Sequence, residues 1–336
     1  MITIKDVAKR AGVSIATVSR VLNNSDTVGE PYRVAVQAAI EELHFQPNMA
    51  ARSLKKRPYH TIGVIMPDFS TPFYEQIIKR IERDFRHTGD LVLFVNTYDD
   101  PATERQGIEF MLERQADVLL VSSTGENEAM LQRVREAGVG VIFVDRRPSD
   151  GCFPAVYMDK RRGMRQSLAY LEESGHKRIA VVTGPRQLAS NYDRYLGTMD
   201  HLYEQGREPG EIPFYYGSFS KEYGYEMAAE LLTSDLPPTA IVAGSAVITA
   251  GILLYCREHG VAVPEQLSLI SFGDFSAGDL IEPRLTYISD EHEVIGERLS
   301  ARIKDYFDGR SSDTVDEVTP TLVVHRSVCL QEGESE

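Results

Sequence analysis

Residues 3–24 read TIKDVAKRAGVSIATVSRVLNN, and this stretch decides the fold of the N-terminal part of the chain. Apolar side chains recur at three- and four-residue spacing, as on one face of a short helix: Ile4, Val7, Ala8 and Ala11. Gly12 ends this predicted helix, because glycine adopts a left-handed backbone at little cost. Ser14 can cap a second helix over residues 15–22. Two helices joined by a glycine turn predict a helix-turn-helix, whose core a third predicted helix at about 31–43 closes.

The charge of the chain is unevenly distributed along its length. Residues 1–58 contain nine Lys/Arg and five Asp/Glu, a net charge of +4, whereas the whole chain of 336 residues carries −14. A basic segment attached to an acidic body points to nucleic acid at the basic end, because phosphates repel the remainder. The helical pattern alone leaves open that these helices are ordinary elements of a larger core.

In a helix-turn-helix, the second helix enters the major groove and its N-terminal residues meet the base edges. Arg20 can donate two hydrogen bonds to guanine, and Ile15 and Ala16 can contact thymine methyl groups. Hydroxyl side chains suit the phosphates, which position a protein without specifying the sequence. The residues of this segment that we expect to contact DNA are Thr3, Ser14, Ile15, Ala16, Thr17, Ser19, Arg20 and Asn23.

The run DVAKRAGVSIATVSRVLNN (6–24), followed by PN (47–48) and ARSLK (51–55), resembles the signature of the lactose-repressor (LacI/GalR) family of bacterial transcriptional regulators. The resemblance is close over the first 57 residues and looser over the rest. It implies a cytoplasmic repressor that binds a pseudo-palindromic operator as a homodimer and responds to a small-molecule effector.

The resemblance implies that the linker at 47–59 contains a hinge helix, at about Asn48 to Lys55, that folds when the dimer sits on its operator. So short a helix is marginal alone in water, and we expect it to order on DNA against the partner's copy. Leu54 matches the leucine that wedges into the minor groove. The hinge residues expected to contact DNA are Asn48, Ala51, Leu54 and Lys55. A buried linker leucine and a solvated charged linker at 55–57 are the alternatives.

From Thr61 onward, short apolar runs alternate with amphipathic stretches, as in IGVIM (62–66), LVLFVN (91–96) and RIAVVTG (178–184). This alternation predicts parallel sheets with helices on both faces. Eight such runs exceed one comfortable sheet, so we expect an α/β body of two Rossmann-like lobes with a cleft between them. The resemblance implies the same fold, that of periplasmic sugar-binding proteins.

These observations predict three domains. They are the helix-turn-helix headpiece at 1–46, the hinge at 47–59, and the effector-binding and dimerisation domain at 60–330. Within that last domain, we expect an N-lobe at about 60–160 and 291–320 and a C-lobe at about 161–290 and 321–330.

Ligands of open α/β folds bind beyond the carboxyl ends of the strands. This rule and the resemblance together select the candidate effector contacts Asp68, Phe69, Phe73, Arg146, Asp159, Arg194, Ser245 and Asp274. Aromatic rings can stack on sugar faces, and arginine and aspartate can bind hydroxyls. The alternatives are a core role for Phe73, ion pairs for Arg146 and Arg194, and a helix cap for Asp159.

The cleft departs from the pattern of sugar-binding members of the family. Ser245 and Ala246 stand where those members usually carry Asn-Asp, and Gly273 stands where they usually carry an aspartate. Lys160 replaces an asparagine that often follows Asp159. These changes suggest the hypothesis that the effector is larger, anionic or otherwise unusual, with Arg146, Lys160 and Arg194 offering positive charge. A weak or lost effector response is the alternative.

Other classes of protein find little support in the sequence. P-loop, HExxH and GxSxG motifs are absent, so we expect neither an enzyme nor catalytic residues. Cys152, Cys256 and Cys329 are too scattered for a disulfide framework or a metal site, and no cofactor is expected. The N-terminus lacks a secretory signal, and no apolar run approaches a membrane span. A solute-binding protein without a DNA role is the remaining alternative.

Overall fold

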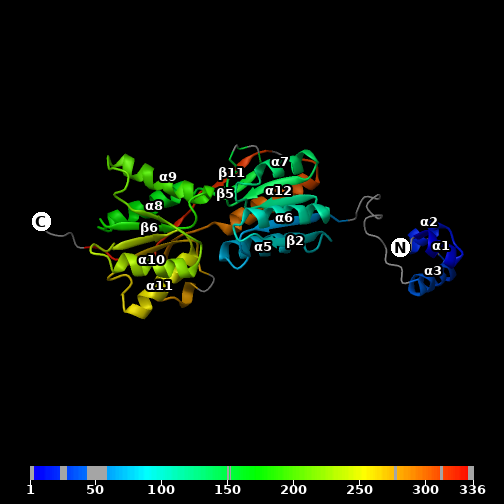
Figure 1. The fold of residues 1–336 in the computed structure, drawn as a ribbon, viewed down its shortest axis with the longest axis horizontal. Coiled ribbons are helices and arrows are strands. Elements are labelled where there is room, and N and C mark those ends of the chain that lie inside the picture. The colour runs from blue at the N-terminus through cyan, green and yellow to red at the C-terminus, as the bar shows by residue number, and fades with distance from the viewer. Residues whose placement is uncertain are drawn as a thin grey trace. The chain divides into compact units, whose positions relative to one another are not determined.

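The computed structural model describes residues 4–22, 29–43, 59–149, 151, 153–275, 278–310 and 313–331. The chain forms two compact units, Met1–Pro58 and Tyr59–Glu336. Figure 1 shows both units, the first in blue and the second from cyan to red.

The described residues of the first unit form three short helices: α1 (Ile4–Ala11), α2 (Ile15–Leu22) and α3 (Glu30–Glu42). Gly12 separates the first two with a backbone φ of 67°, as predicted for a glycine turn. The core comprises the buried side chains Val7, Ala8, Val18, Val21, Val36 and Ala39. Apolar residues from all three helices therefore close a small helix-turn-helix core.

The second unit contains a first sheet of six parallel strands. They are β1 (Thr61–Met66), β2 (Leu91–Asn96), β3 (Val118–Val121), β4 (Gly140–Val144), β5 (Ala155–Met158) and β11 (Val315–Val318). The order across the sheet is β11-β5-β4-β3-β1-β2. Buried residues of α5 (Pro72–Phe85) and α12 (His292–Phe307) pack on one face. Those of α6 (Pro101–Glu113) and α7 (Glu128–Glu136) pack on the other.

A second sheet of six strands follows the same plan. Its strands are β6 (Ile179–Thr183), β7 (Phe214–Tyr216), β8 (Ala240–Ala243), β9 (Ser268–Phe272), β10 (Thr286–Ile288) and β12 (Leu322–Val323). Their order is β12-β10-β9-β8-β6-β7, with β12 antiparallel to β10. Helices α8 (Lys160–Glu173) and α9 (Ala189–Glu204) cover one face. Helices α10 (Lys221–Leu232) and α11 (Ala246–His259) cover the other.

The prediction of an α/β body with two parallel-dominated sheets is confirmed, and four strands were not predicted. These are β7, β10, β11 and β12, which have two to four residues each and carry partly exposed positions. Their apolar signal is therefore weaker than that of the buried strands β1 and β9. None of the helices that the structure describes combines the length and apolarity needed to cross a membrane.

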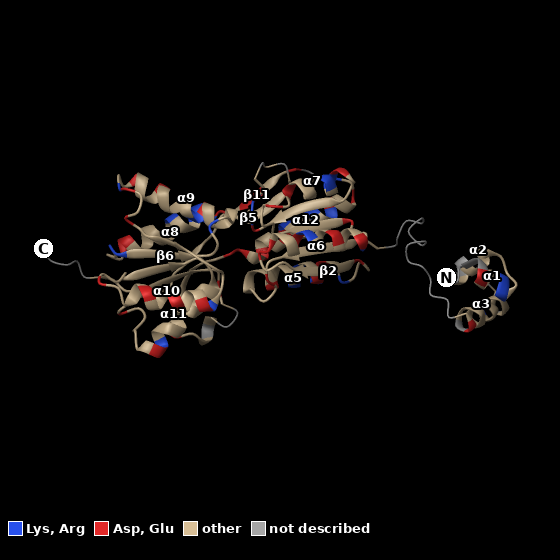
Figure 2. Ribbon diagram, viewed as in Figure 1, with Lys and Arg blue, Asp and Glu red and all other residues tan. Residues whose placement is uncertain are grey.

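The chain passes from one sheet to the other three times within the second unit. The crossings lie between β5 and α8, between β10 and α12, and between β11 and β12. The loops at the carboxyl ends of the two sheets consequently face a common space. Acidic and basic residues are interspersed over the helices of both lobes (Figure 2).

Candidate functional site

A cavity of about 290 Å³ lies between the two sheets of the second unit. Loops from both sheets line it, since its walls include residues that follow β1, β4, β6, β8, β9 and β10. Six of the eight predicted effector contacts are on these walls: Asp68, Phe73, Arg146, Arg194, Ser245 and Asp274. The structure thus brings together residues up to about two hundred positions apart in the sequence, as the carboxyl-end rule predicts.

The loop between β1 and α5 positions the first wall of the cavity. Asp68 Oδ1 accepts a hydrogen bond of 2.8 Å from the main-chain N–H of Ser70, which turns the chain after the strand. Pro72 then begins α5, where its fixed φ and missing N–H fit the first helical turn. Phe73 and Tyr74 follow directly and lie on the cavity wall.

Arg146 is buried on the wall and already has an anionic partner. Its Nη1 lies 2.7 Å from Asp99 Oδ1 and donates to the main-chain O of Ser123 at 3.2 Å. Burial disfavours its charge, but Tyr74 and Asp99 outweigh burial and raise the pKa of Arg146 above its ordinary value. The ion pair considered from the sequence therefore exists, although the side chain also lines the cavity.

A second buried pair joins Lys160 to Asp145. Lys160 Nζ lies 2.8 Å from Asp145 Oδ1, and the hydroxyl of Tyr74 donates to Asp145 Oδ2 at 2.8 Å. Burial raises the pKa of Asp145, but Lys160 and Arg146 more than offset this, so the pKa lies below its ordinary value. Lys160 therefore does not present an unpaired charge to the cavity.

The backbone is strained on the same walls. Tyr98, Asp99 and Asp145 have φ values of 53°, 59° and 66°, in the left-handed region that side chains other than glycine rarely adopt. Each such residue costs about 1–3 kcal/mol and persists only where its surroundings fix it. Clustering of this strain around one cavity is typical of a functional site.

Arg194 reaches the cavity from α9. Its Nη1 donates to the main-chain O of Ser190 and to Asn191 Oδ1, and its guanidinium lies 4.8 Å from the centre of the Phe272 ring. Gly197, one turn later, lets α8 approach α9, because a Cβ there would lie 2.3 Å from the main-chain O of Arg161. The RYLG motif thus combines a cavity residue with a helix-packing glycine.

Phe69 and Asp159 do not line the cavity, so their predicted contact with an effector finds no support. The ring of Phe69 packs edge-on against Phe94 and against the core. Asp159 Oδ1 accepts the main-chain N–H of Arg162 at 2.8 Å, which caps α8. The cap considered as the alternative from the sequence is therefore the role that its geometry supports.

The structure also places carboxylates that the sequence reading missed. Asp99 lies in the loop between β2 and α6, and Asp290 follows β10, a strand that the sequence does not predict. Asp290 Oδ2 lies 3.4 Å from where a Cβ on Gly273 would stand. The carboxylate of Asp290, at the end of β10, therefore lies close to the place where an aspartate side chain at position 273 would begin. Ser245 lines the cavity too, but its Oγ caps α11.

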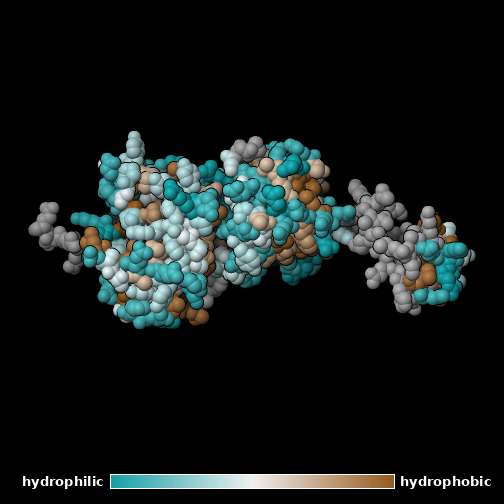
Figure 3. Space-filling model, in the orientation of Figure 1, coloured by the Kyte–Doolittle hydropathy of each residue, from teal (hydrophilic) through white to brown (hydrophobic). Residues whose placement is uncertain are grey.

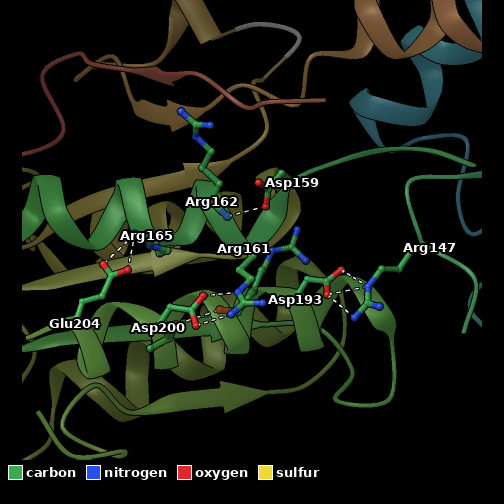
Figure 4. A network of polar contacts seen from close by, with 10 residues as sticks. Arg147, Asp159, Arg161, Arg162, Arg165, Asp193, Asp200 and Glu204 are labelled. Carbon is green, nitrogen blue, oxygen red and sulfur yellow. Dashed lines mark hydrogen bonds and ion pairs between the residues drawn. The ribbon is translucent and has the colours of Figure 1, made fainter. Parts of the chain in front are cut away.

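The outer side of the site carries a polar network between the lobes and along two helices (Figure 4). Arg147, from the loop after β4, pairs with Asp193 of α9 at 2.9 Å. On α8, Arg161 and Arg165 face α9 and pair with Asp200 and Glu204. The Arg147 pair ties the first lobe to the helix that carries Arg194.

The predicted DNA contacts fall partly within the described residues. Ile15 is 45% exposed at the start of α2, and Ser14 Oγ accepts the main-chain N–H of Thr17 at 3.1 Å, as expected of a cap. Ala16, Ser19 and Arg20 belong to α2, but their side chains are not described. Six further predicted contacts lie outside the described residues: Thr3, Asn23, Asn48, Ala51, Leu54 and Lys55.

Comparison with known proteins covers both units. Residues 3–48 match the family described as "Bacterial regulatory proteins, lacI family". Residues 59–319 match "Periplasmic binding proteins and sugar binding domain of LacI family". The repressor PurR of Pectobacterium carotovorum is 31% identical over 98% of this chain and 97% of its own. The regulator GalR of Escherichia coli is 31% identical over 98% of this chain and 96% of its own.

Solved structures show the same fold over almost the whole chain. A complex of the transcriptional regulator CelR with cellobiose is 26% identical, with a TM-score of 0.71 over 97% of this chain and all of that one. A Lac repressor dimer bound to operator and an anti-inducer is 23% identical, with a TM-score of 0.75 over 98% and 99%. The chain belongs to the LacI family of bacterial regulatory proteins, which are transcriptional regulators and not enzymes.

Proposed function

We propose that this chain is a homodimeric repressor in the bacterial cytoplasm, whose affinity for a pseudo-palindromic operator is controlled by a sugar or sugar derivative. The observation that carries the proposal is the cavity at the carboxyl ends of two sheets, on the same chain as a helix-turn-helix. In this proposal, residues 1–46 read the operator, 47–59 form the hinge, and 60–330 bind the effector and the second copy.

The walls of the cavity suit a polyhydroxylated ligand. Phe73 and Phe219 offer aromatic faces, and Asp68, Asp274 and Asp290 offer carboxylate oxygens that accept hydrogen bonds from hydroxyls. The related regulator CelR was solved in complex with cellobiose, which supports a carbohydrate class for the effector. The volume of about 290 Å³ lies at the small end of ligand pockets and favours a single sugar unit.

An exposed apolar edge of the first sheet supports the homodimer. Leu91 and Phe94 on the edge strand β2, and Phe110 on α6, are exposed. Figure 3 shows apolar surface, in brown, on the lobe that the first sheet forms. An uncovered apolar edge strand is a ready site for a second chain. The related Lac repressor was solved as a dimer on its operator.

One strand links the proposed hinge to the cavity. Residues 47–59 lead directly into β1, and Asp68 follows the other end of β1 on the cavity wall. Closure of the lobes on an effector would turn the first lobe against the second about the three crossings and so shift the two hinge segments of a dimer. The hinge then acts as the two-state element that couples effector to operator.

DNA binding by the full chain tests the proposal. Duplexes selected from a randomised pseudo-palindromic library should bind with an affinity that falls steeply with salt. A variant lacking residues 1–57 should lose this binding and keep any binding of sugars. If no duplex is enriched, or if the deletion leaves DNA binding intact, the proposal is wrong.

A further inference from the structure

Arg194 differs from the other cations of the cavity in having no anionic partner within the part of the chain that the structure describes. Arg146 is paired with Asp99 and Lys160 with Asp145, at 2.7 and 2.8 Å. Among the residues that the structure describes, none places a carboxylate within 4 Å of the Arg194 guanidinium. Two of the three cations that the sequence analysis proposed for binding an anion are therefore already paired with carboxylates of the chain.

The surroundings of Arg194 make this lack of a partner costly. The side chain is 6% exposed, and its Nε has no hydrogen-bond partner among the described residues. The described partners of its Nη1 are two neutral oxygens, the main-chain O of Ser190 at 3.0 Å and Asn191 Oδ1 at 3.1 Å. Burial lowers the pKa of Arg194 to about 10. A buried ion without a partner destabilises the fold, because the protein does not replace the water that the charge has lost.

Asp145 and Asp193 are the carboxylates that do most to raise the pKa of Arg194, but both already bind other cations. Asp145 accepts from Lys160 through Oδ1 and from Tyr74 through Oδ2. Asp193 is held by Arg147, whose Nε donates to both of its oxygens at 3.0 and 3.2 Å. No small rotation of either side chain can serve Arg194 without breaking another buried or half-buried pair.

We propose that the effector carries an anionic group, a carboxylate or a phosphate, which pairs with Arg194 inside the cavity. The inference rests on the proposed function and narrows the effector class from sugars in general to anionic sugar derivatives. It also fixes the orientation of the ligand. The acidic walls formed by Asp68, Asp274 and Asp290 repel an anion but accept hydrogen bonds from hydroxyls.

Calorimetry on the full chain tests the inference with three matched compounds for each of two sugars. They are glucose, glucuronate and glucose 6-phosphate, and galactose, galacturonate and galactose 6-phosphate. In at least one series an anionic member should bind roughly tenfold or more tightly than its neutral parent, as a charge-assisted hydrogen bond provides. The uronate and phosphate arms identify which anion fits.

Two variants assign the preference to Arg194. Arg194→Gln should bring the anionic compound to within roughly threefold of its neutral parent, whereas Arg105→Gln, at an exposed position on α6, should leave the preference unchanged. If the neutral parent binds as tightly as its anions in both series, if none of the anions binds, or if Arg194→Gln keeps the preference, the inference is overturned.

A second measurement does not depend on which compound is chosen. Without ligand, Arg194→Met should keep or raise the midpoint of thermal unfolding, because it removes an unpaired buried charge and can pack on Phe272. Asn191 Oδ1 retains its bond from Thr183 Oγ1 at 2.7 Å, so the variant orphans no acceptor there. A clear fall in the midpoint would instead make Arg194 a structural residue and overturn the inference. If the unmodified full chain binds no operator duplex, that result would contradict the proposed function and leave the pairing of Arg194 with an anion to the two measurements above.

Discussion

Lys160 Nζ lies 2.8 Å from Asp145 Oδ1 and 2.7 Å from the main-chain O of the same residue. Lys160 begins α8 on the second sheet, and Asp145 follows β4 of the first, so this buried pair ties the two lobes at a crossing. The double contact also holds Asp145 at its φ of 66°. A charged pair therefore stands at the point about which the lobes would move.

Replacement of Lys160 by methionine should destabilise the unliganded protein. The change leaves Asp145 buried with Tyr74 as its remaining side-chain partner and should cost about 3–5 kcal/mol, as expected when one member of a buried pair is removed. Urea unfolding followed by circular dichroism measures the loss. Lys79→Met, in an exposed pair with Glu75, is the control and should cost under about 1 kcal/mol. Equal losses for both would contradict the role assigned to Lys160.

The pH dependence of that loss has a definite sign. In the folded protein the pKa of Asp145 is lowered, so its contribution is present above the unfolded value of about 4 and is lost as pH falls through the lower folded value. Without Lys160, burial is opposed only by Arg146 and Tyr74, so Asp145 in the variant should take up a proton at a higher pH than in the wild type, and this protonation removes part of the cost of the buried charge. The difference in stability between wild type and Lys160→Met should thus be larger at pH 7 than at pH 5.

Replacement of Asp99 by asparagine should destabilise the protein, because it leaves the buried guanidinium of Arg146 without its carboxylate partner. Asparagine tolerates the left-handed backbone at this position, so the change removes charge with little added strain. We expect a loss of about 1–3 kcal/mol in the free energy of unfolding. Asp308→Asn, in an exposed pair with Arg310, should change stability by less than about 1 kcal/mol. If Asp99→Asn is neutral, the pair with Arg146 does not hold this wall.

The elements visible in the sequence are those whose signal is local. Strands such as β1 and β9 read as uninterrupted apolar runs because both faces are buried, and Ser14, the predicted cap of α2, stands next to the helix it caps. β11 reads VDEV and has exposed positions, so its pattern does not distinguish it from a loop. Because the sequence does not predict β10, it also does not place Asp290 at the carboxyl end of a strand.

Pairings between distant residues could not be read from the sequence. The carboxyl-end rule selects Arg146 as a cavity residue, but nothing local shows that Asp99 neutralises it. The asparagine-to-lysine change at position 160 looked like added positive charge for an anion, whereas the structure uses that charge on Asp145. Only the three-dimensional arrangement shows that, of the three cations on the cavity wall, Arg194 is the one with no carboxylate partner among the described residues.

His292 should titrate above its ordinary range. A 2.8 Å hydrogen bond that His292 Nδ1 donates to Asp290 Oδ1 raises the pKa of His292, burial opposes this, and Asp290, Glu293 and Asp274 add favourable charge. A raised pKa stabilises the fold below the unfolded value of about 6.5, and this stabilisation is lost as pH rises through the folded value. An NMR titration should show a lower pKa for His292 in Asp290→Asn. An unchanged pKa in that variant would exclude Asp290 as the cause.

Leu54 lies outside the described residues, and its role as a wedge stays a prediction from the sequence. Leu54→Ala should reduce the bend of the operator, because a methyl group is too small to unstack a base step. Phasing of the bound duplex in gel electrophoresis measures the bend. Lys56→Ala is the control, which should weaken binding through lost charge and leave the bend unchanged. A wild-type bend in Leu54→Ala would refute the assignment.

Arg20 and Thr17 should differ in how their loss affects DNA binding. The predicted role of Arg20 is to donate to a guanine edge, so Arg20→Ala should cost about 1–3 kcal/mol at that base pair and relax specificity there. Thr17, whose Oγ1 lies 2.8 Å from Ser14 Oγ at the start of α2, is predicted to face the backbone of DNA. Thr17→Ala should therefore weaken binding about equally for all sequences.

Binding of each variant to operators substituted one base pair at a time separates the two patterns. If Arg20→Ala loses affinity uniformly, Arg20 contacts phosphate and the base reading must come from other residues of α2.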